Sequence, residues 1–237
     1  MTNHLYYGDN LRVLRDHIAD GSVDLIYLDP PFNSNASYNV LFRSPTGDRS
    51  AAQIEAFGDT WHWGDEAEAA FQEVRRSGHT DAAVRLEAMR SFLGTNDMMA
   101  YLAMMAVRLV ELHRVLKPTG SLYLHCDPTA SHYLKILLDA VFGAFHFKNE
   151  ITWQRTTPKG HAFTRFASNH DVILFYKGSG ENVWNQQYYP HSQEYLKKYN
   201  MIDEKSGKRF QATSLINPNS DRPNLTYEFH GHHRVWR

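Results

Sequence analysis

The feature that most constrains the fold is a short apolar run that ends in two prolines. Residues 23–28 (VDLIYL) are mostly apolar and lead directly into Asp29, Pro30, Pro31 and Phe32. A nearly continuous apolar run is typical of a strand buried on both faces of a parallel sheet. Because two prolines cannot continue a central strand, a loop must leave its carboxyl end at Asp29. Ligands bind at that end of open α/β sheets, so the sequence predicts a binding edge around Asp29.

Strand and helix signals alternate along most of the chain. We predict further strands at residues 5–7, 121–125, 151–154 and 172–176. Apolar positions at helical spacing predict helices from Asp9 or Asn10 to Gly21, at residues 97–116 and at residues 127–143. The methionines of the second helix are interpreted as core residues rather than as a binding groove. This alternation indicates an α/β sheet with helices on both sides.

Charge and composition suggest two regions. We expect a catalytic α/β core at residues 1–148, with a helical insertion at about residues 44–96. Residues 149–237 are expected to hold the end of the sheet and the start of a basic target-recognition region. Lys and Arg number 12 against 18 Asp and Glu up to Phe147, and 13 against 8 after it. The second region could therefore meet phosphates, with ordinary surface variation as the alternative.

Composition excludes several other classes of protein. No apolar run approaches the roughly 18 residues that span a bilayer, and the polar N-terminus lacks a signal-peptide core. Cys126 is the only cysteine, which excludes an internal disulfide and a multi-cysteine zinc site. We therefore expect a cytoplasmic protein without a membrane partner.

The Asp-Pro-Pro-Phe tetrapeptide suits a planar group that carries an exocyclic amine. The Asp29 carboxylate and the Pro30 carbonyl can each accept a hydrogen bond from the amine, which localises its nitrogen lone pair. Phe32 can stack on the ring. The alternative is a simple turn that ends the strand.

Three segments in this order give the chain a resemblance to a known family. They are residues 5–10 (LYYGDN), residues 22–33 (SVDLIYLDPPFN) and residues 117–125 (KPTGSLYLH). The chain resembles the amino-terminal part of the β-class DNA amino-methyltransferases, including the type III-like modification enzymes of restriction systems. The resemblance implies a Rossmann-like methyltransferase sheet with circularly permuted motif order. It also implies S-adenosyl-L-methionine as the cofactor and a base flipped out of double-stranded DNA.

The resemblance also assigns roles to residues. Asp29, Pro30, Pro31 and Phe32 form the catalytic loop. Three residues are expected to bind or border the cofactor: Asp9, at its adenine, and His125 and Asp127. No metal is expected, because methyl transfer to an amine needs none; clustered His230, His232 and His233 are interpreted as base, phosphate or surface contacts.

Basic and aromatic residues near residues 151–154 are candidates for nucleic-acid binding. Arginine and lysine can neutralise phosphates, and an aromatic ring can stack on a base or replace a flipped one. The alternative is a solvated loop. The candidates are Trp153, Arg155, Lys159, His161 and Arg165.

The target base is indicated by the first residue of the tetrapeptide. Family members that act on adenine N6 usually have Asp there, whereas cytosine-N4 enzymes favour Ser, so Asp29 favours adenine. Cytosine N4, RNA and a protein glutamine remain alternatives. Cytosine-C5 chemistry needs a cysteine thiolate, but Cys126 is interpreted as a small buried residue at a strand end.

One family motif has no counterpart in the sequence. A Phe-x-Gly-x-Gly turn after a strand, which lets the backbone approach the cofactor, is not found at any glycine. We therefore expect an enzyme truncated before this motif, inactive alone. A DNA-binding or specificity module without catalysis is the alternative from another class. A second copy of the chain or a restriction subunit are the protein partners considered.

Overall fold

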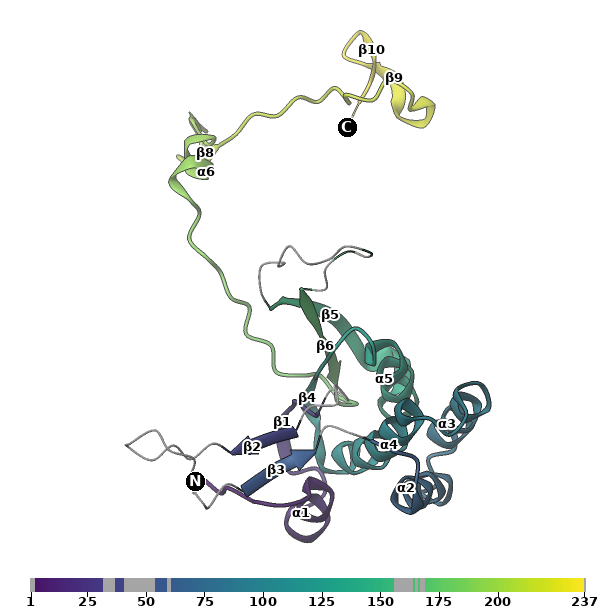
Figure 1. Ribbon diagram of the computed structural model, residues 1–237. Coiled ribbons are helices and arrows are strands. Elements are labelled where there is room, and N and C mark those ends of the chain that lie inside the picture. The colour runs from purple at the N-terminus through teal and green to yellow at the C-terminus, as the bar shows by residue number, and fades with distance from the viewer. Residues whose placement is uncertain are drawn as a thin grey trace. The chain divides into compact units, whose positions relative to one another are not determined.

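The computed structural model describes residues 3–31, 37–40, 54–58, 61–155, 164, 166 and 169–236, the second and third of these ranges by backbone alone. The chain divides into two compact units, Met1–Trp184 and Asn185–Arg237. The first unit contains the sheet and the large helices, and the second contains short elements only (Figure 1).

The first unit is built on a four-stranded sheet in the order β1-β4-β6-β5. These strands are β1 (Val23–Leu28), β4 (Leu116–Cys126), β6 (His170–Lys177) and β5 (Phe147–Gln154). β1 runs parallel to β4, and β6 runs antiparallel to both β4 and β5. A parallel pair needs a long crossover, which α2–α4 supply here, so the predicted α/β class is confirmed.

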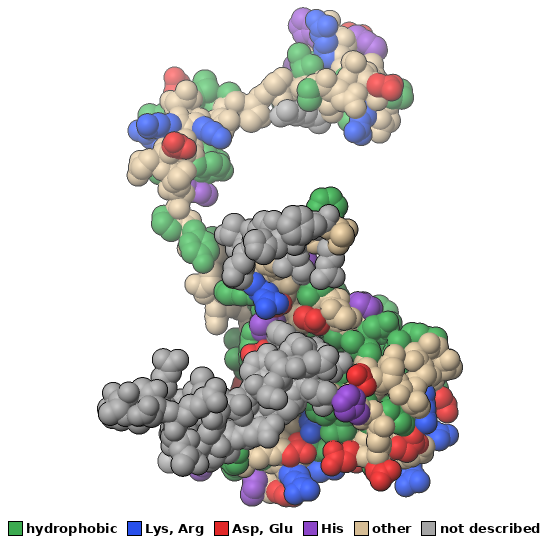
Figure 2. Space-filling model, in the orientation of Figure 1, with side chains coloured by type: hydrophobic (Ala, Val, Ile, Leu, Met, Phe, Trp, Pro, Cys, Tyr) green, Lys and Arg blue, Asp and Glu red, His purple; other side chains and the backbone are tan. Residues whose placement is uncertain are grey.

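Helix α4 (Asp97–Val115) forms the centre of the helical layer, with eleven buried residues that include Met99 and Met105. The helices α1 (Asn10–His17), α2 (Asp65–Arg76), α3 (Thr80–Leu93) and α5 (Ser131–Leu138) all contact it. The methionines are thus core residues, as predicted. Charged side chains of both signs are interspersed on the solvent side of this layer (Figure 2).

The sheet presents two different faces. Leu122, Leu124 and Cys126 of β4 are fully buried in the core, whereas Leu25 and Tyr27 of β1 are more than half exposed on the opposite face. Within the described residues the helices therefore gather on one side of the sheet, although the sequence predicted both sides (Figure 1). The reason is that β5 and β6 form an antiparallel hairpin, which needs no crossover helix.

Several predicted elements have different bounds. Residues 5–7 form no strand; Leu5 is 98% exposed and no described strand pairs with this segment. β4 begins at Leu116 instead of residue 121, with a register irregularity opposite Val23. The predicted helix 127–143 begins at Ser131 and continues after α5 as a π-helix, Asp139–Gly143, and a 3-10 turn, Ala144–His146.

The remaining elements are short. β2 (Ser37–Val40) precedes the region predicted as an insertion and pairs antiparallel with β3 (Ile54–Gly58). The predicted region itself contains β3, α2 and α3. The second unit contains α6 (Gln193–Lys197), the 3-10 turn Pro223–Leu225 and two small hairpins. The hairpins pair β7 (Met201–Ile202) with β8 (Arg209–Phe210) and β9 (Thr226–Phe229) with β10 (His232–Val235).

The boundary between the units falls after the sheet. The expected boundary after residue 148 lies inside β5, because β5 and β6 complete the sheet of the first unit. Trp184 is the last residue of that unit, and its ring stacks on Phe175 of β6 at 6.4 Å between centroids. Among the described residues of the second unit, none is buried.

Candidate active site

The ends of β1, β4 and β5 and the start of β6 lie side by side at one end of the sheet. Leu28, the last residue of β1, pairs with Leu124, and Cys126, the last residue of β4, pairs with Val172 near the start of β6. Trp153, near the end of β5, pairs with Asp171. The register therefore brings together side chains that lie far apart in the sequence. They are Asp29, His125, Asp171, Trp153 and Arg155.

The centre of this cluster is the imidazole of His125. Its Nδ1 lies 3.2 Å from Oδ1 of Asp29, and its Nε2 lies 3.2 Å from Oδ2 of Asp171. The two carboxylates differ in exposure: 60% of the Asp29 side chain is accessible, against 5% for Asp171. The Asp29 carboxylate can therefore contact a substrate, whereas the Asp171 carboxylate is buried.

Tyr27 adds a hydroxyl to the same cluster. Its oxygen lies 3.4 Å from Nδ1 of His125. Burial, and then the negative charge of Asp29, raise the pKa of Tyr27 above its usual value. The phenol consequently keeps its proton at neutral pH and can serve as a hydrogen-bond donor beside Asp29.

The predicted nucleic-acid residues are only partly described. Trp153 is 56% exposed, and Nη1 of Arg155 lies 3.3 Å from Oδ1 of Asp171. The structure thus places these two beside the Asp29 cluster. Lys159, His161 and Arg165 lie outside the described residues, as does Phe32, whereas Pro30 and Pro31 are half-buried directly after Asp29.

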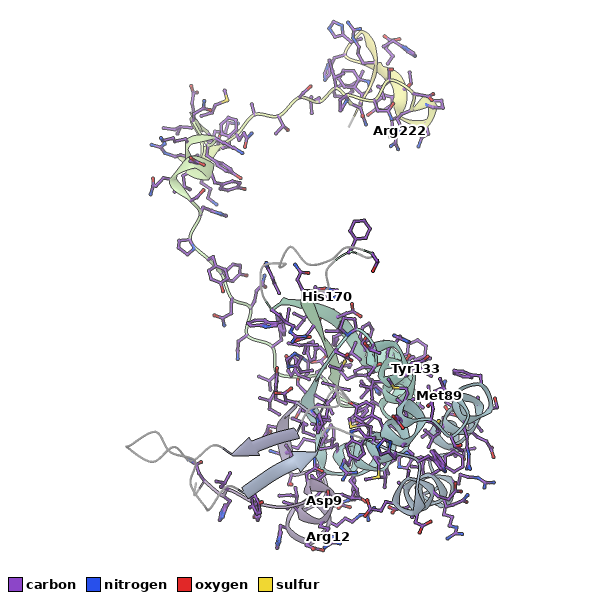
Figure 3. The ribbon with its side chains drawn as sticks, in the orientation of Figure 1. Asp9, Arg12, Met89, Tyr133, His170 and Arg222 are labelled. Carbon is purple, nitrogen blue, oxygen red and sulfur yellow. The ribbon has the colours of Figure 1, made fainter. Side chains whose placement is uncertain are left out.

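Asp9 and Asp127 are both predicted at the cofactor. Asp9 caps the start of α1, whereas Asp127 bonds within the turn that precedes α5. Oδ1 of Asp9 accepts hydrogen bonds from the Leu11 amide at 2.9 Å and from Nη2 of Arg108 at 2.8 Å. Oδ1 of Asp127 accepts one from the amide of Ala130 at 3.1 Å. Figure 3 shows Asp9 at the start of α1 and His170 at the start of β6. The roles of Asp9 and Asp127 toward a cofactor stay predictions.

Cys126 lies at the end of β4 and is fully buried. Burial, and then nearby carboxylates, raise the pKa of its thiol to about 12. A thiol with this pKa is not a nucleophile at neutral pH. The interpretation of Cys126 as a buried strand-end residue is confirmed.

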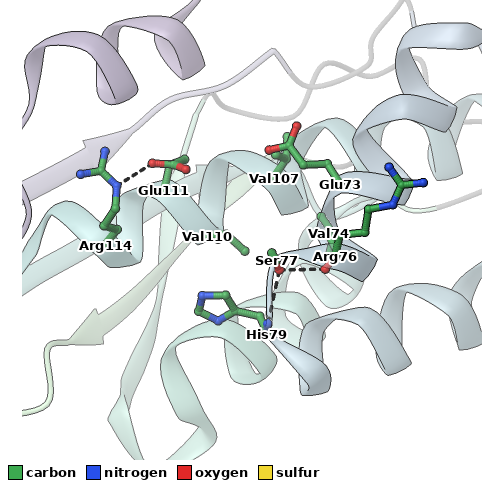
Figure 4. A pocket seen from close by; sticks show the side chains of 9 residues that line it. All are labelled: Glu73, Val74, Arg76, Ser77, His79, Val107, Val110, Glu111 and Arg114. Atoms are coloured by element: carbon green, nitrogen blue, oxygen red, sulfur yellow. Dashed lines mark hydrogen bonds and ion pairs between the residues drawn. The ribbon is translucent and has the colours of Figure 1, made fainter.

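A separate hollow of about 400 Å³ lies in the helical layer (Figure 4). It is lined mainly by α2 and α4 and contains Glu73, Arg76, His79, Glu111 and Arg114. It shares no residue with the Asp29 cluster. Glu73, Glu111 and Arg114 also take part in ion pairs of the helical layer, such as Arg114 with Glu111 at 2.7 Å.

The described part of the chain shows neither a metal-ligand cluster nor a membrane-spanning helix. No three His, Cys, Asp or Glu side chains gather there as metal ligands, and His232 and His233 lie on β10. None of the helices described is both long and apolar enough to cross a bilayer.

Sequence reasoning missed Asp171 and Tyr27. One signal for Asp171 was available, since it is the only charged residue between His170 and Lys177 in an otherwise apolar strand. A buried charge in such a strand needs partners, which marks it as a residue with a specific contact. Tyr27 carried no comparable signal, because a tyrosine in an apolar strand is ordinary packing.

Comparison with known proteins decides the family. The profile of the N6_N4_Mtase family, described as DNA methylase, matches residues 23–235. The chain belongs to this DNA methylase family. The match covers the sheet, the helices from α2 to α5 and nearly all of the second unit.

Among curated relatives of this family, the Mod subunit of the type III restriction-modification enzyme StyLTI from Salmonella typhimurium is 27% identical over 194 residues. That alignment covers 81% of this chain and 26% of the relative. The type II methyltransferase M.KpnI from Klebsiella pneumoniae is 24% identical, with 95% of this chain and 44% of the relative covered. The chain thus spans less than half the length of either relative.

Solved structures of DNA methylases show a weaker likeness. The M1.HpyAVI-SAM complex has a TM-score of 0.39 at 13% identity and covers 79% of this chain and 60% of that one. The cytosine-N4-specific PvuII DNA methyltransferase has a TM-score of 0.36 at 13% identity, with 82% and 61% covered. The family assignment rests on the profile match and not on these likenesses.

Proposed function

We propose that the chain provides the catalytic loop of a DNA methyltransferase that transfers a methyl group from S-adenosyl-L-methionine to N6 of a flipped adenine. One observation carries the proposal. An exposed carboxylate, Asp29, stands at the carboxyl end of β1, is contacted by His125 and precedes two prolines, in a chain of the DNA methylase family.

The residues that are present fit the predicted cofactor in one respect. Both described contacts of the Asp9 carboxylate use Oδ1, and 41% of the side chain is accessible. Oδ2 can therefore accept a hydrogen bond from a ligand amine or hydroxyl. When bound, S-adenosyl-L-methionine supplies an electrophilic methyl group.

The catalytic loop orients the amine. The Asp29 carboxylate and the Pro30 carbonyl accept hydrogen bonds from the two N–H groups of the amine. These bonds localise the nitrogen lone pair and aim it away from the ring. Asp29 can accept the proton that the amine loses once it carries the methyl group. Phe32 stacks on the base, and Trp153 and Arg155 hold the DNA beside it. No covalent intermediate with the protein forms.

Asp29 favours adenine N6. Cytosine N4 is the second candidate, because the family covers both amines and because the PvuII enzyme is described as specific for cytosine N4. As a further part of the proposal, the enzyme acts on double-stranded DNA in the bacterial cytoplasm, with a restriction subunit as its protein partner. The type III Mod relative supports this partner.

The test is methylation of DNA by the complete natural protein and by its Asp29→Ala variant. Digestion of the treated DNA and identification of the modified nucleoside separates N6-methyladenine from N4-methylcytosine. We expect Asp29→Ala to abolish methylation and to leave DNA binding largely intact. Asp24→Ala is the matched control, since Asp24 lies on the same strand but pairs with Lys117 at the surface. Full activity of Asp29→Ala would contradict the proposal.

A further inference from the structure

We propose that Asp171 is a positioning residue that holds the catalytic carboxylate of Asp29 in place through His125. This inference rests on the function proposed above and extends it to a residue on another strand. The side chain of Asp171 is buried beside the His125 ring, with 5% of it accessible.

The hydrogen-bond geometry of His125 supports a link between Asp171 and Asp29. The two ring nitrogens lie at the same distance, 3.2 Å, from a carboxylate oxygen on either side. Carboxylates accept only, and a neutral imidazole can donate from one nitrogen only. Whichever nitrogen carries the proton, the ring lies within hydrogen-bond distance of both carboxylates. His125 then acts as a bridge between the buried and the exposed carboxylate.

The two ends of this bridge differ in rigidity. Asp171 lies inside the β4–β6–β5 ladder, where its backbone is fixed by pairing with Trp153. Asp29 lies one residue beyond the end of β1, at the start of a loop. Rigid supporting contacts that orient a reactive group are a general requirement of active sites. The paired strands therefore orient the Asp29 carboxylate through Asp171 and His125, which the loop alone cannot do.

A purely structural ion pair is the alternative. A buried carboxylate needs partners, and Arg155 already supplies one at 3.3 Å. An ion pair that only provided a partner for the buried Asp171 carboxylate would not require the second ring nitrogen of His125 to lie beside Asp29. Its placement there, with the Tyr27 hydroxyl 3.4 Å away, points to a role in the reaction.

The experiment measures kcat and KM of the complete methyltransferase with Asp171→Asn, which keeps the shape and removes the charge. We expect kcat to fall about 10- to 100-fold, the range for outer carboxylates that orient a histidine in metal sites. KM for DNA and cofactor should stay unchanged. Asp139→Asn is the control. Asp139 is a carboxylate in the π-helix that continues α5, where it pairs with Lys135, and it lies outside the cluster around His125.

A double-mutant cycle shows whether Asp171 acts through His125. Asp171→Asn should cause no further loss in a His125→Ala background. His125→Asn provides a second route if Asp171→Asn fails to fold, since it keeps a donor near the position of Nδ1 but none at Nε2. It should lower kcat by a similar factor.

Each outcome has one meaning. Retention of kcat within twofold by Asp171→Asn or by His125→Asn would overturn the inference, as would independent, multiplying effects in the cycle. Absence of methylation by the unmodified protein would instead overturn the proposed function.

Discussion

Replacing Tyr176 with phenylalanine removes one hydroxyl from the core between β6 and α5. The side chain is completely buried, and its hydroxyl donates to Oδ1 of Asp139 at 2.7 Å. Burial, and then the bond to Asp139, raise the pKa of Tyr176, so the hydroxyl stays protonated. Lys135 also holds both oxygens of Asp139 at 2.8 Å, so the variant does not leave this carboxylate unpaired.

The magnitude can be worked out from these contacts. A hydrogen bond to a charged group contributes about 1.5–3 kcal/mol to stability. Because Lys135 remains as a partner, we expect the lower half of this range, about 1.5–2 kcal/mol, for Tyr176→Phe. Urea denaturation at neutral pH should show a lower midpoint and an unchanged slope, since the same surface is exposed on unfolding.

Tyr123→Phe is the matched control for this measurement. Tyr123 lies on the neighbouring strand, and its ring stacks on Phe175 at 4.5 Å. The ring contact survives the substitution, so a loss below about 0.5 kcal/mol is expected. Equal losses for the two variants would refute the argument, because they would show that the Asp139 contact contributes nothing particular to the stability of the fold.

Three further predictions concern other parts of the first unit. Burial, and then the charges of His79 and His146, lower the pKa of His113, so the unfolded chain binds its proton more readily. Stability should therefore fall as pH drops below about 6.5, and His113→Gln should flatten that fall in pH-dependent thermal unfolding. Cys126, with its thiol pKa raised to about 12, should resist a thiol reagent at pH 8 until urea unfolds the protein. Asp9→Ala should lose about 1 kcal/mol in urea unfolding through the lost helix cap, whereas Asp9→Asn, which can still cap, should lose less.

Local patterns in the sequence predicted the central elements well. The strand at residues 23–28 and the helix starting at Asp97 have the observed bounds or nearly so. Both carry signals that lie within one element: a continuous apolar run in the first, and apolar positions at helical spacing in the second. The exposed carboxylate at the end of that strand was predicted from the same local pattern.

The supporting residues could not be predicted in this way. Asp171 lies 46 residues after His125, and their contact depends on the register between β4 and β6. Register between distant strands is set by packing of the whole sheet, which no local pattern reports. The strand expected at residues 5–7 failed for a related reason, because a strand needs a neighbour to pair with, and the described sheet offers it none.

The hairpin of β5 and β6 has a consequence for how its connecting segment can vary. The amide of Arg155 donates to the carbonyl of Asn169 at 2.8 Å, so the ladder continues past Gln154 and His170 to the ends of the connecting segment. The connecting segment, residues 156–168, thus begins and ends next to paired backbone. On the function proposed above, exchanging this connecting segment should leave the Asp171–His125–Asp29 contacts as they are, because none of these three residues lies in it.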